Sequence, residues 1–377
     1  MVFTGMGIGN WGVDTAWADE TVTQAAEPWD GKTQTPVEPN SDGVYEISTG
    51  AELAWFAAKV NDGTVANANA VLTNDIDLGS QEWTPIGNKT TPFKGSIDGQ
   101  NHRIENLSIT KGDTAYIAFI GYAAESKIQN LTVDGEINIA NATSIMAVAG
   151  IVACFSQAYE VINCVNEVNI TLSKIEISKS FSKSFFVGGI CAQNHIRIDA
   201  KIIGSTNKGN ITCSASVTQK ILVAGIVGSG SQNITIENCL NTGEVNATIN
   251  GGETLYASGI ACFVNSSSPT ISNCVNLKSV NAAGANGVWA TTKKAAIAVN
   301  LQNYPINSYY VEGTANSGIA GANGSDVADE TSGIVCKDAN AMKEPAVLDA
   351  LNSATSTSGY AVTWGAGTDG YPQIAEV

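Results

Sequence analysis

The segments "IQNLTV" (128–133), "VINCVN" (161–166), "IENCLN" (236–241) and "ISNCVN" (271–276) are copies of one repeat, and "IENLSI" (104–109) and "IIGSTN" (202–207) align with them. Isoleucine or valine always occupies the first position, and asparagine occupies the third in every copy except the one that has Gly204. The fourth position is leucine, cysteine or serine. A repeat of this kind without a helical period is typical of a β-solenoid, in which equivalent residues of successive coils stack on one another.

Each copy is expected to be a short strand whose first and fourth residues face the interior. Residues stacked in this way lie at the strand spacing of about 4.8 Å. Asparagine tolerates left-handed backbone geometry at turns, and stacked asparagine side chains can bond their neighbours. We therefore interpret the repeated asparagines and cysteines as structural.

A second motif of small residues followed by an aliphatic residue precedes most copies, as in "AGIVA" (149–153), "GGICA" (188–192) and "AGIVG" (224–228). Such a motif suits a tight corner that leads into a buried strand. Extra residues recur between each repeat copy and the next corner, at 138–148, 171–187, 212–223 and 246–257. We expect these insertions to form hairpins or an added sheet, and stacked insertions often make a binding face.

The composition is that of an acidic, turn-rich β protein. The 377 residues include 38 glycines, 14% are charged, and the net charge of −16 argues against partners such as nucleic acid or anionic membranes. No apolar stretch is long enough to span a membrane. The eight cysteines lack CxxC or Cys/His zinc spacing, so we expect free interior thiols, with Cys239 and Cys274 the one neighbouring pair that could form a bridge. No metal, cofactor or catalytic residue is predicted.

The chain divides into four parts. Residues 1–18 end in "AWA" and resemble a truncated signal-peptide leader, and residues 19–42 are expected to be a linker. Residues 43–335 are expected to form the β-helix, with "GAELAWFAAKVNDG" (50–63) as a helical cap over its N-terminal end. Residues 336–377 are expected to form a helix and closing strands at the other end.

Several segments resemble proteins with the GLUG motif. These segments are "AELAWFAAKVN" (51–61), "LTNDIDLGSQEWTPIG" (72–87), "FKGSIDGQNHRIENLSI" (93–109) and the closing "WGAGTDGYPQI" (364–374). The resemblance covers about residues 43–377 and implies a right-handed parallel β-helix (a pectate-lyase-like solenoid) on a bacterial cell surface. The family carries no agreed catalytic residues, and this chain has no HExxH protease motif.

Three groups of residues suggest chemistry or binding. Asp75 and Asp77 share one face of a strand and could be half of a calcium site or an acid/base pair, although such residues more often bond turn backbone. His195, Arg197 and Asp199 alternate with isoleucines, and this strip is compatible with a β-helix polysaccharide lyase. Lys174, Lys179 and Lys183 make a local basic patch in one insertion, for which a solvated hairpin is the simpler interpretation.

We therefore expect an all-β, right-handed parallel β-helix with an N-terminal capping helix and a C-terminal cap. The expected function is that of a secreted or cell-surface bacterial module, a monomer, that binds a glycan or a host or extracellular protein through stacked loops without catalysis. A β-helix polysaccharide lyase or glycoside hydrolase is the alternative, and a rigid structural stalk is a third possibility.

Overall fold

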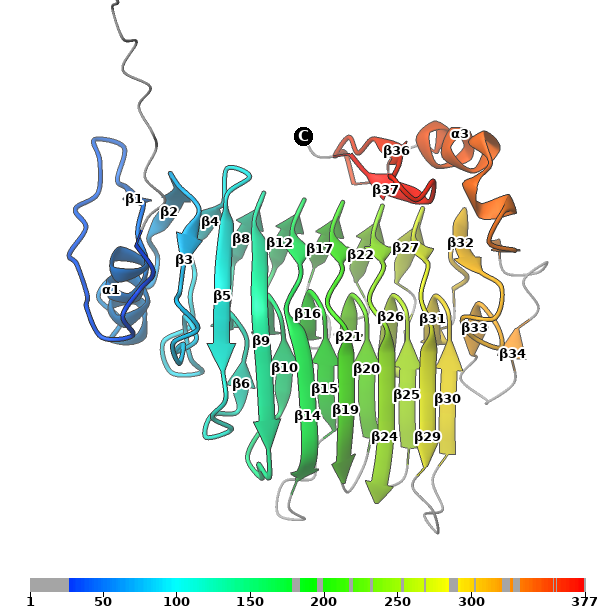
Figure 1. Ribbon diagram of the computed structural model, residues 1–377, viewed down its shortest axis with the longest axis horizontal. Coiled ribbons are helices and arrows are strands. Elements are labelled where there is room, and N and C mark those ends of the chain that lie inside the picture. Colours follow the sequence, from blue (N-terminus) through cyan, green and yellow to red (C-terminus); the bar gives the residue numbers. More distant parts are fainter. Residues whose placement is uncertain are drawn as a thin grey trace, which may run out of the picture.

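The computed structural model is a right-handed parallel β-helix whose coils follow one another along a single axis (Figure 1). It describes residues 27–177, 184–194, 199–216, 220–230, 233–251, 254–267, 269–284, 291–301, 303–320, 326–327, 333–354, 356 and 358–375. Four sheets run along the axis, and nearly every strand pairs in parallel with the equivalent strands of the coils before and after it. The fold class expected from the repeat is confirmed.

Two sheets carry the repeat itself. The upper sheet has eight strands: β1 (Val44–Ile47), β2 (Asn69–Leu72), β4 (Ser96–Asp98), β8 (Ser126–Gln129), β12 (Tyr159–Ile162), β17 (Ala200–Ile203), β22 (Ile234–Glu237) and β27 (Thr270–Ser272). The front sheet has 13 strands: β3 (Ile76–Asp77), β5 (Arg103–Ile109), β9 (Thr132–Ala140), β13 (Val165–Asn166), β14 (Asn169–Glu176), β18 (Thr206–Asn207), β19 (Ile211–Ser216), β23 (Leu240–Asn241), β24 (Val245–Gly251), β28 (Val275–Asn276), β29 (Val280–Gly284), β32 (Ser308–Val311) and β35 (Ile334–Lys337).

Two sheets form the back of the molecule. The lower back sheet has six strands: β6 (Tyr116–Ile117), β10 (Ala147–Ala149), β15 (Phe185–Gly188), β20 (Lys220–Ala224), β25 (Thr254–Ser258) and β30 (Thr291–Ala295). The upper back sheet has eight: β7 (Ile120–Ala123), β11 (Val152–Phe155), β16 (Cys191–Asn194), β21 (Val227–Ser229), β26 (Ala261–Ser267), β31 (Ala298–Leu301), β33 (Ile319–Ala320) and β34 (Asp326–Val327). The insertions therefore lengthen the front strands and supply strands of the lower back sheet, so the added-sheet expectation is confirmed.

The repeat positions take the expected roles. Residues at the first and fourth positions, such as Ile128 and Cys164, are fully buried. The third position turns the chain from the upper sheet to the front sheet, and its asparagines have φ values near +50°, as at Asn130 (φ 51) and Asn163 (φ 52). Gly204 has the same geometry with φ 60.

The sixth position holds a column of asparagines inside the protein. Asn166, Asn207, Asn241 and Asn276 have no exposed surface, and each amide nitrogen donates to the amide oxygen of the next, at 2.7, 2.8 and 2.8 Å. Each nitrogen also donates to a carbonyl two residues later in its own coil, as Asn241 does to Gly243 at 2.8 Å. The buried amides are thereby satisfied from coil to coil.

The small-residue corners are the partners of this column. A Cβ on Gly150 would lie 1.7 Å from Asn166 Oδ1, and one on Gly189 would lie 2.3 Å from Asn207 Oδ1. Gly225 and Gly259 stand in the same relation to Asn241 and Asn276. The glycines of the small-residue corners therefore pack directly against the asparagines of the repeat inside the protein.

The first repeat copy is placed differently from the sequence alignment. Ile104 pairs with Val133 instead of Ile128, and the residue that pairs with Ile128 in the preceding coil is Ile97. The alignment of "IENLSI" with "IQNLTV" was wrong because β4 already occupies the upper sheet opposite β8, so this segment lies in the front sheet opposite β9.

The N-terminal end of the core is covered by α1 (Gly50–Asn61), as expected. Thr49 caps this helix and forms a capping box with Glu52, and the face with Leu53, Phe56 and Val60 is buried in the main core. Part of the expected linker also packs here: Trp29 is 9% exposed, stacks edge-on against Trp83 and donates to the carbonyl of Thr33.

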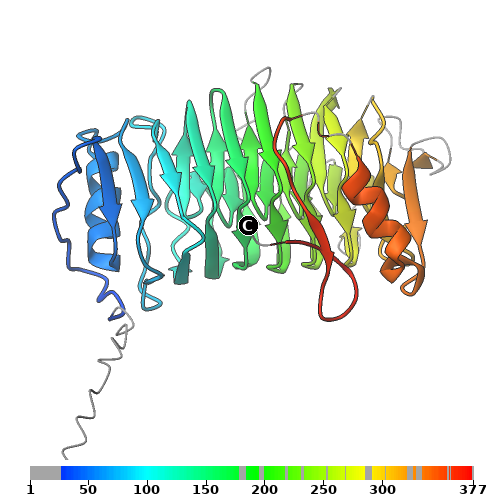
Figure 2. The same ribbon diagram turned by 90° about the horizontal axis from the view of Figure 1, so that it is seen from above.

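The C-terminal segment does not lie where the sequence suggested. We call residues 345–375 the C-terminal strap. It follows a short 3-10 helix, η1 (Ala341–Lys343), and begins with α3 (Pro345–Ser353). Its last part is the antiparallel strand pair β36 (Trp364–Ala366) and β37 (Pro372–Ile374). Figures 1 and 2 show that it runs back along the flank of the β-helix over the upper ends of the coils. The expectation that this segment closes the far end was wrong.

Outward-facing apolar residues explain the position of the strap. Leu240, Val275 and Tyr309 stack on the outside of β23, β28 and β32 and form one buried cluster with Val347, Leu351 and Trp364 of the strap. Strap contacts continue to β22, where Trp364 Nε1 donates to Asn238 Oδ1 at 3.1 Å and the Ser358 amide donates to Glu237. Burial of these side chains stabilises the lateral position.

Replacing Asn241 with alanine tests the interior column. The Asn241→Ala substitution removes the acceptor of Asn207 and the donor to Asn276, so we expect a loss of about 2–4 kcal/mol in the free energy of unfolding. Urea unfolding followed by circular dichroism measures this loss. The control is Asn246→Ala on the outer face of β24, for which a loss below about 1 kcal/mol is expected; equal losses would contradict a stabilising interior column.

Candidate functional site

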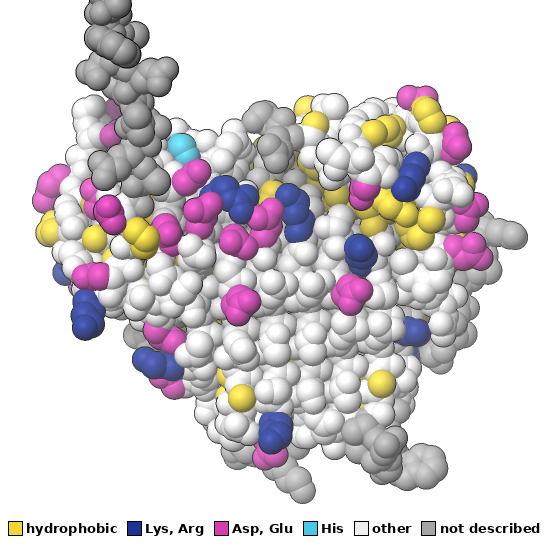
Figure 3. Space-filling view, viewed as in Figure 1, with side chains coloured by type: hydrophobic (Ala, Val, Ile, Leu, Met, Phe, Trp, Pro, Cys, Tyr) yellow, Lys and Arg dark blue, Asp and Glu magenta, His cyan; other side chains and the backbone are white. Residues whose placement is uncertain are grey.

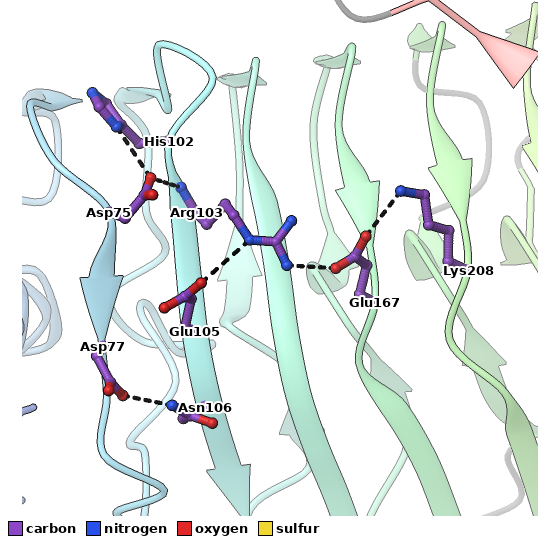
Figure 4. A network of polar contacts seen from close by, with 8 residues as sticks. All are labelled: Asp75, Asp77, His102, Arg103, Glu105, Asn106, Glu167 and Lys208. Carbon is purple, nitrogen blue, oxygen red and sulfur yellow. Dashed lines mark hydrogen bonds and ion pairs between the residues drawn. The ribbon is translucent and has the colours of Figure 1, made fainter. Parts of the chain in front are cut away.

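The acidic residues singled out in the sequence bond turns and strand ends. Asp77 accepts from the Gly79 amide at 2.7 Å and from Asn106 Nδ2 at 2.8 Å, and Asp75 accepts from the Arg103 amide at 2.9 Å (Figure 4). His102 Nδ1 lies 3.2 Å from Asp75. These contacts support the structural interpretation of Asp75 and Asp77, and within the described residues no group of three His, Cys, Asp or Glu side chains could hold a metal ion.

A row of ion pairs crosses the upper part of the front sheet beside these residues. Arg103 contacts Glu105 and Glu167, and Lys208 Nζ lies 2.9 Å from Glu167 (Figure 4). Burial alone would raise the pKa of Glu167, but Arg103 and Lys208 lower it, while Glu167 raises the pKa of Arg103. Arg103 and Glu105 lie on the same strand, whereas Arg103 reaches past β9 to Glu167, and Lys208 of the following coil also contacts Glu167, so these last two ion pairs tie coils together.

Figure 3 shows this charged row above a front face that is otherwise largely uncharged. The outward side chains of the lower front sheet are amides and hydroxyls, with Asn138, Thr171, Thr212, Asn246 and Asn281 in one stacked column. This column makes part of the lower front face polar and uncharged.

The lyase-like strip lies mostly outside the described residues. His195 and Arg197 are not described, whereas Asp199 accepts from Asn233 Nδ2 at 3.2 Å. In the basic patch, Lys174 is exposed on β14, and Lys179 and Lys183 lie outside the described residues. The structure therefore leaves both hypotheses as predictions.

A groove of about 800 Å³ lies on the outer face of the upper sheet, and we call it the upper groove. It extends over β2, β4, β8, β12, β17 and β22, and five steps of about 4.8 Å between strands make it about 24 Å long. Its lining comprises Asn69, Lys94, Gly95, Ser96, Glu125, Ser126, Lys127, Ala158, Tyr159, Glu160, Asp199, Ala200, Lys201, Asn233 and Thr235.

Charges in the upper groove are balanced. Three lysines (94, 127 and 201) face three acids (Glu125, Glu160 and Asp199), so the groove is neutral on a protein with a net charge of −16. One central pair is tightly held, because Lys201 Nζ lies 3.0 Å from Glu160. An equal number of both signs favours no strongly charged ligand.

The C-terminal strap forms one side of this charged centre. Tyr360 donates its hydroxyl to Glu160 at 2.9 Å, and its ring lies 5.8 Å from Lys127 Nζ and 5.6 Å from Lys201 Nζ. Burial would raise the pKa of Glu160, but the bonds from Lys201 and Tyr360 lower it. Glu160 is therefore held ionised and fully engaged by its neighbours.

Two polar side chains of the groove lining have buried hydroxyl groups. Ser126 Oγ and the Tyr159 hydroxyl have no hydrogen-bond partner among the described residues, and both side chains line the groove. The Tyr159 ring stacks on Phe155 with 3.6 Å between centroids, and burial raises the pKa of its hydroxyl well above the ordinary value. A hydroxyl kept protonated in this way can act as a donor but not as a base.

Seven of the cysteines are enclosed in the interior, where their thiols are poor nucleophiles. Seven of the eight are buried, and burial raises the pKa of Cys164, Cys191 and Cys213 to about 12. Cys239 and Cys274 are not bridged. Because the thiolate is the reactive form, these thiols fill interior space.

Comparisons with known proteins found one similar curated sequence and one similar solved structure, each with limited similarity. No protein-family model matches the chain. A curated protein of Evansella cellulosilytica, provisionally named a Gly-rich membrane protein, is 30% identical over 106 residues, which are 26% of this chain and 12% of that protein. A crystal structure from Bacteroides ovatus, provisionally described as an immunoglobulin A1 protease, is 16% identical with a TM-score of 0.47, covering 95% of this chain and 100% of that chain.

These likenesses do not assign a function. The chain spans only 12% of the length of its curated relative, and the fold assignment rests on the strand pairing of the chain itself. The GLUG resemblance stays a prediction. Among the described residues, no helix is long and apolar enough to cross a membrane.

The sequence analysis missed the upper groove, although a signal was present. Lys127, Glu160 and Lys201 each directly precede the first position of a repeat copy, and the registers of β8, β12 and β17 place them side by side. Alternating charges at one outward repeat position indicate an exposed charged row. Only the structure shows that the strap borders it.

Thiol titration tests the enclosure of the cysteines. Since Cys336 is the one exposed cysteine, we expect about one thiol per chain to react rapidly with a disulfide reagent at pH 8, and all eight after denaturation. The Cys336→Ser variant should show almost no rapid reaction. Rapid reaction of two or more thiols in the native protein would contradict the buried columns.

Acid unfolding tests the ion pairs of Glu160 and Glu167. Both have pKa values lowered below the ordinary 4.5, so they stabilise the fold above that value, and this contribution is lost as the pH falls through the lowered pKa values. The double variant Glu160→Gln/Glu167→Gln should be less stable at neutral pH. Its thermal unfolding temperature should also fall less than that of the unaltered protein between about pH 5 and pH 3. Parallel pH profiles would contradict this assignment.

Proposed function

We propose that this protein is an exported, non-enzymatic bacterial β-helix module that binds an extended, net-neutral polysaccharide along the upper groove. The observation that carries the proposal is the groove itself, a neutral polar channel about 24 Å long on a protein of net charge −16. A polymer lying along the axis of the β-helix would meet side chains from six consecutive strands.

The chemistry of the lining supports a hydroxyl-rich ligand. Sugar hydroxyls both donate and accept, and the groove offers ammonium donors such as Lys94, carboxylate acceptors such as Glu125, and amides such as Asn233. The Tyr360 ring at the strap side supplies an aromatic surface next to these groups. A strongly anionic polymer would be repelled by the acids and by the net charge of the protein.

The absence of catalysis is part of the proposal. A glycosidase needs one carboxyl group that is free to give a proton and a second that is suitably spaced. The central carboxylate of the groove, Glu160, is instead held ionised by Lys201 and Tyr360. Export is supported by the leader-like residues 1–18 and by the GLUG resemblance, and it is tested by fractionating cells that produce the chain.

Binding should be measured on residues 19–377 with a panel of neutral, acidic and basic polysaccharides by affinity electrophoresis, with reducing-end and unsaturated-product assays in parallel. We expect retardation by at least one neutral polysaccharide without product formation. Lys127→Ala should weaken this binding about tenfold, because the cation lies in the middle of the groove. The matched control is Lys278→Ala, whose exposed lysine lies outside the groove.

Two results would contradict the proposal. One is binding that Lys127→Ala and Lys278→Ala affect equally. The other is product formation from a bound polysaccharide, which would favour the lyase or glycosidase hypothesis and direct mutagenesis to His195 and Arg197.

A further inference from the structure

A second, smaller pocket lies where the outer asparagine ladder is interrupted. The third repeat position stacks Asn130, Asn163, Gly204, Asn238, Asn273 and Asn307 along the turn between the upper and front sheets. Asn163 donates to Asn130 at 3.4 Å, and on the far side Asn273 donates to Asn238 and Asn307 donates to Asn273, both at 2.5 Å. Gly204 is the one member without a side chain.

Beside this interruption of the ladder lies a pocket that we call the ladder-gap pocket. Its volume is about 240 Å³, and its lining comprises Asn101, Arg103, Asn130, Thr132, Asn163, Val165, Gly204, Thr206, Ile374 and Ala375. A Cβ on Gly204 would lie 2.5 Å from Asn163 Oδ1 and 3.0 Å from Val362 of the strap. The pocket therefore depends on glycine at position 204 and on the strap, whose last residues form one wall.

The lining combines uncharged polar groups with apolar walls. Asn101, Asn130 and Asn163 present amides and Thr132 presents a hydroxyl, while Val165 and Ile374 present hydrocarbon. A pyranose ring has the same two kinds of surface, hydroxyl groups on its rim and C–H groups on its faces. Pockets with an apolar body and a few converging polar groups are typical of small-molecule sites.

Electrostatics at the pocket favour a neutral ligand. Arg103 is the charged residue of the lining, and it already contacts Glu105 and Glu167. Arg103 disfavours a cation, and its two glutamates, together with the net charge of the protein, disfavour an anion.

We propose that the ladder-gap pocket binds a single neutral pyranose unit. This site goes beyond the upper groove and shares no lining residue with it. The strap contributes Ile374 and Ala375 to the pocket, so the same segment that borders the upper groove also completes this second site.

Filling the gap tests the proposal. Asparagine at position 204 accepts the φ of +60 that Gly204 adopts, but its Cβ would lie 2.5 Å from Asn163 Oδ1, so the new side chain must displace the Asn163 amide from the pocket lining. Binding is measured by saturation-transfer NMR with the methyl pyranosides of glucose, galactose, mannose and N-acetylglucosamine, alongside methyl glucuronide and methyl glucosaminide. We expect at least one neutral glycoside to bind, Gly204→Asn to weaken it at least tenfold, and the charged glycosides to bind more weakly.

The controls separate binding from folding. Gly313→Asn makes the same change at a φ of +81 in open space and should leave binding unchanged. Lys278→Ala, which changes an exposed lysine outside both the upper groove and this pocket, should also leave it unchanged. If Gly204→Asn lowers the thermal unfolding temperature, Asn163→Gly, which keeps the left-handed turn and removes the amide, should weaken binding instead.

The proposal is overturned if no neutral glycoside binds the unaltered protein. It is also overturned if binding survives both Gly204→Asn and Asn163→Gly, or if a charged glycoside binds more tightly than every neutral one.

Discussion

Side-chain hydrogen bonds between identical buried asparagines set the geometry of this β-helix. Asn166, Asn207 and Asn241 each donate to the asparagine of the next coil, and all four asparagines donate to a carbonyl of their own coil. Within the column, each buried amide oxygen from Asn207 to Asn276 accepts from the asparagine of the preceding coil at the same height. The column therefore fixes the register of one coil on the next, and a register slip would leave buried amides unpaired.

The other features depend on this interior contact. Glycines of the small-residue corners leave room for the amides, which is why the corner motif accompanies the repeat. The regular stack in turn places outward side chains in straight columns. Where those columns are apolar, at Leu240, Val275 and Tyr309, the C-terminal strap covers them. Where they are polar, at Lys127, Glu160 and Lys201, they form the floor of the upper groove.

The sequence predicted the structure of the repeat well, but it did not predict which segment packs on the outside of the repeat. Local periodicity predicted the inward positions and the left-handed asparagines, because each depends on residues near in sequence or on an equivalent residue one coil away. The strap could not be placed, because its contacts join residues far apart, such as Trp364 to Asn238 and Tyr360 to Glu160. The placement of Ile104 was missed because its segment resembles the later repeat copies, whereas the strand around Ile97 that takes the upper-sheet position does not.

The residues of the candidate sites could also be seen in the sequence, whereas their arrangement in space could not. Gly204 was visible as an exception in the repeat, but its meaning depends on the strap residues that close the pocket around it. Likewise, the charges of the upper groove were visible singly, whereas their neutral balance required the stacking of six strands. A repeat therefore predicts the scaffold, and the departures from the repeat indicate where to look for binding.

The central claim is that the asparagine column is buried and continuously hydrogen bonded, and hydrogen exchange of its side-chain amides tests it most directly. The side-chain NH2 signals of Asn207 and Asn241, assigned by NMR, should exchange with solvent deuterium only over hours or longer, whereas that of Asn246, which is half-buried on the outer face of β24, should exchange much faster. Exchange of Asn207 and Asn241 as fast as that of Asn246 would contradict the account.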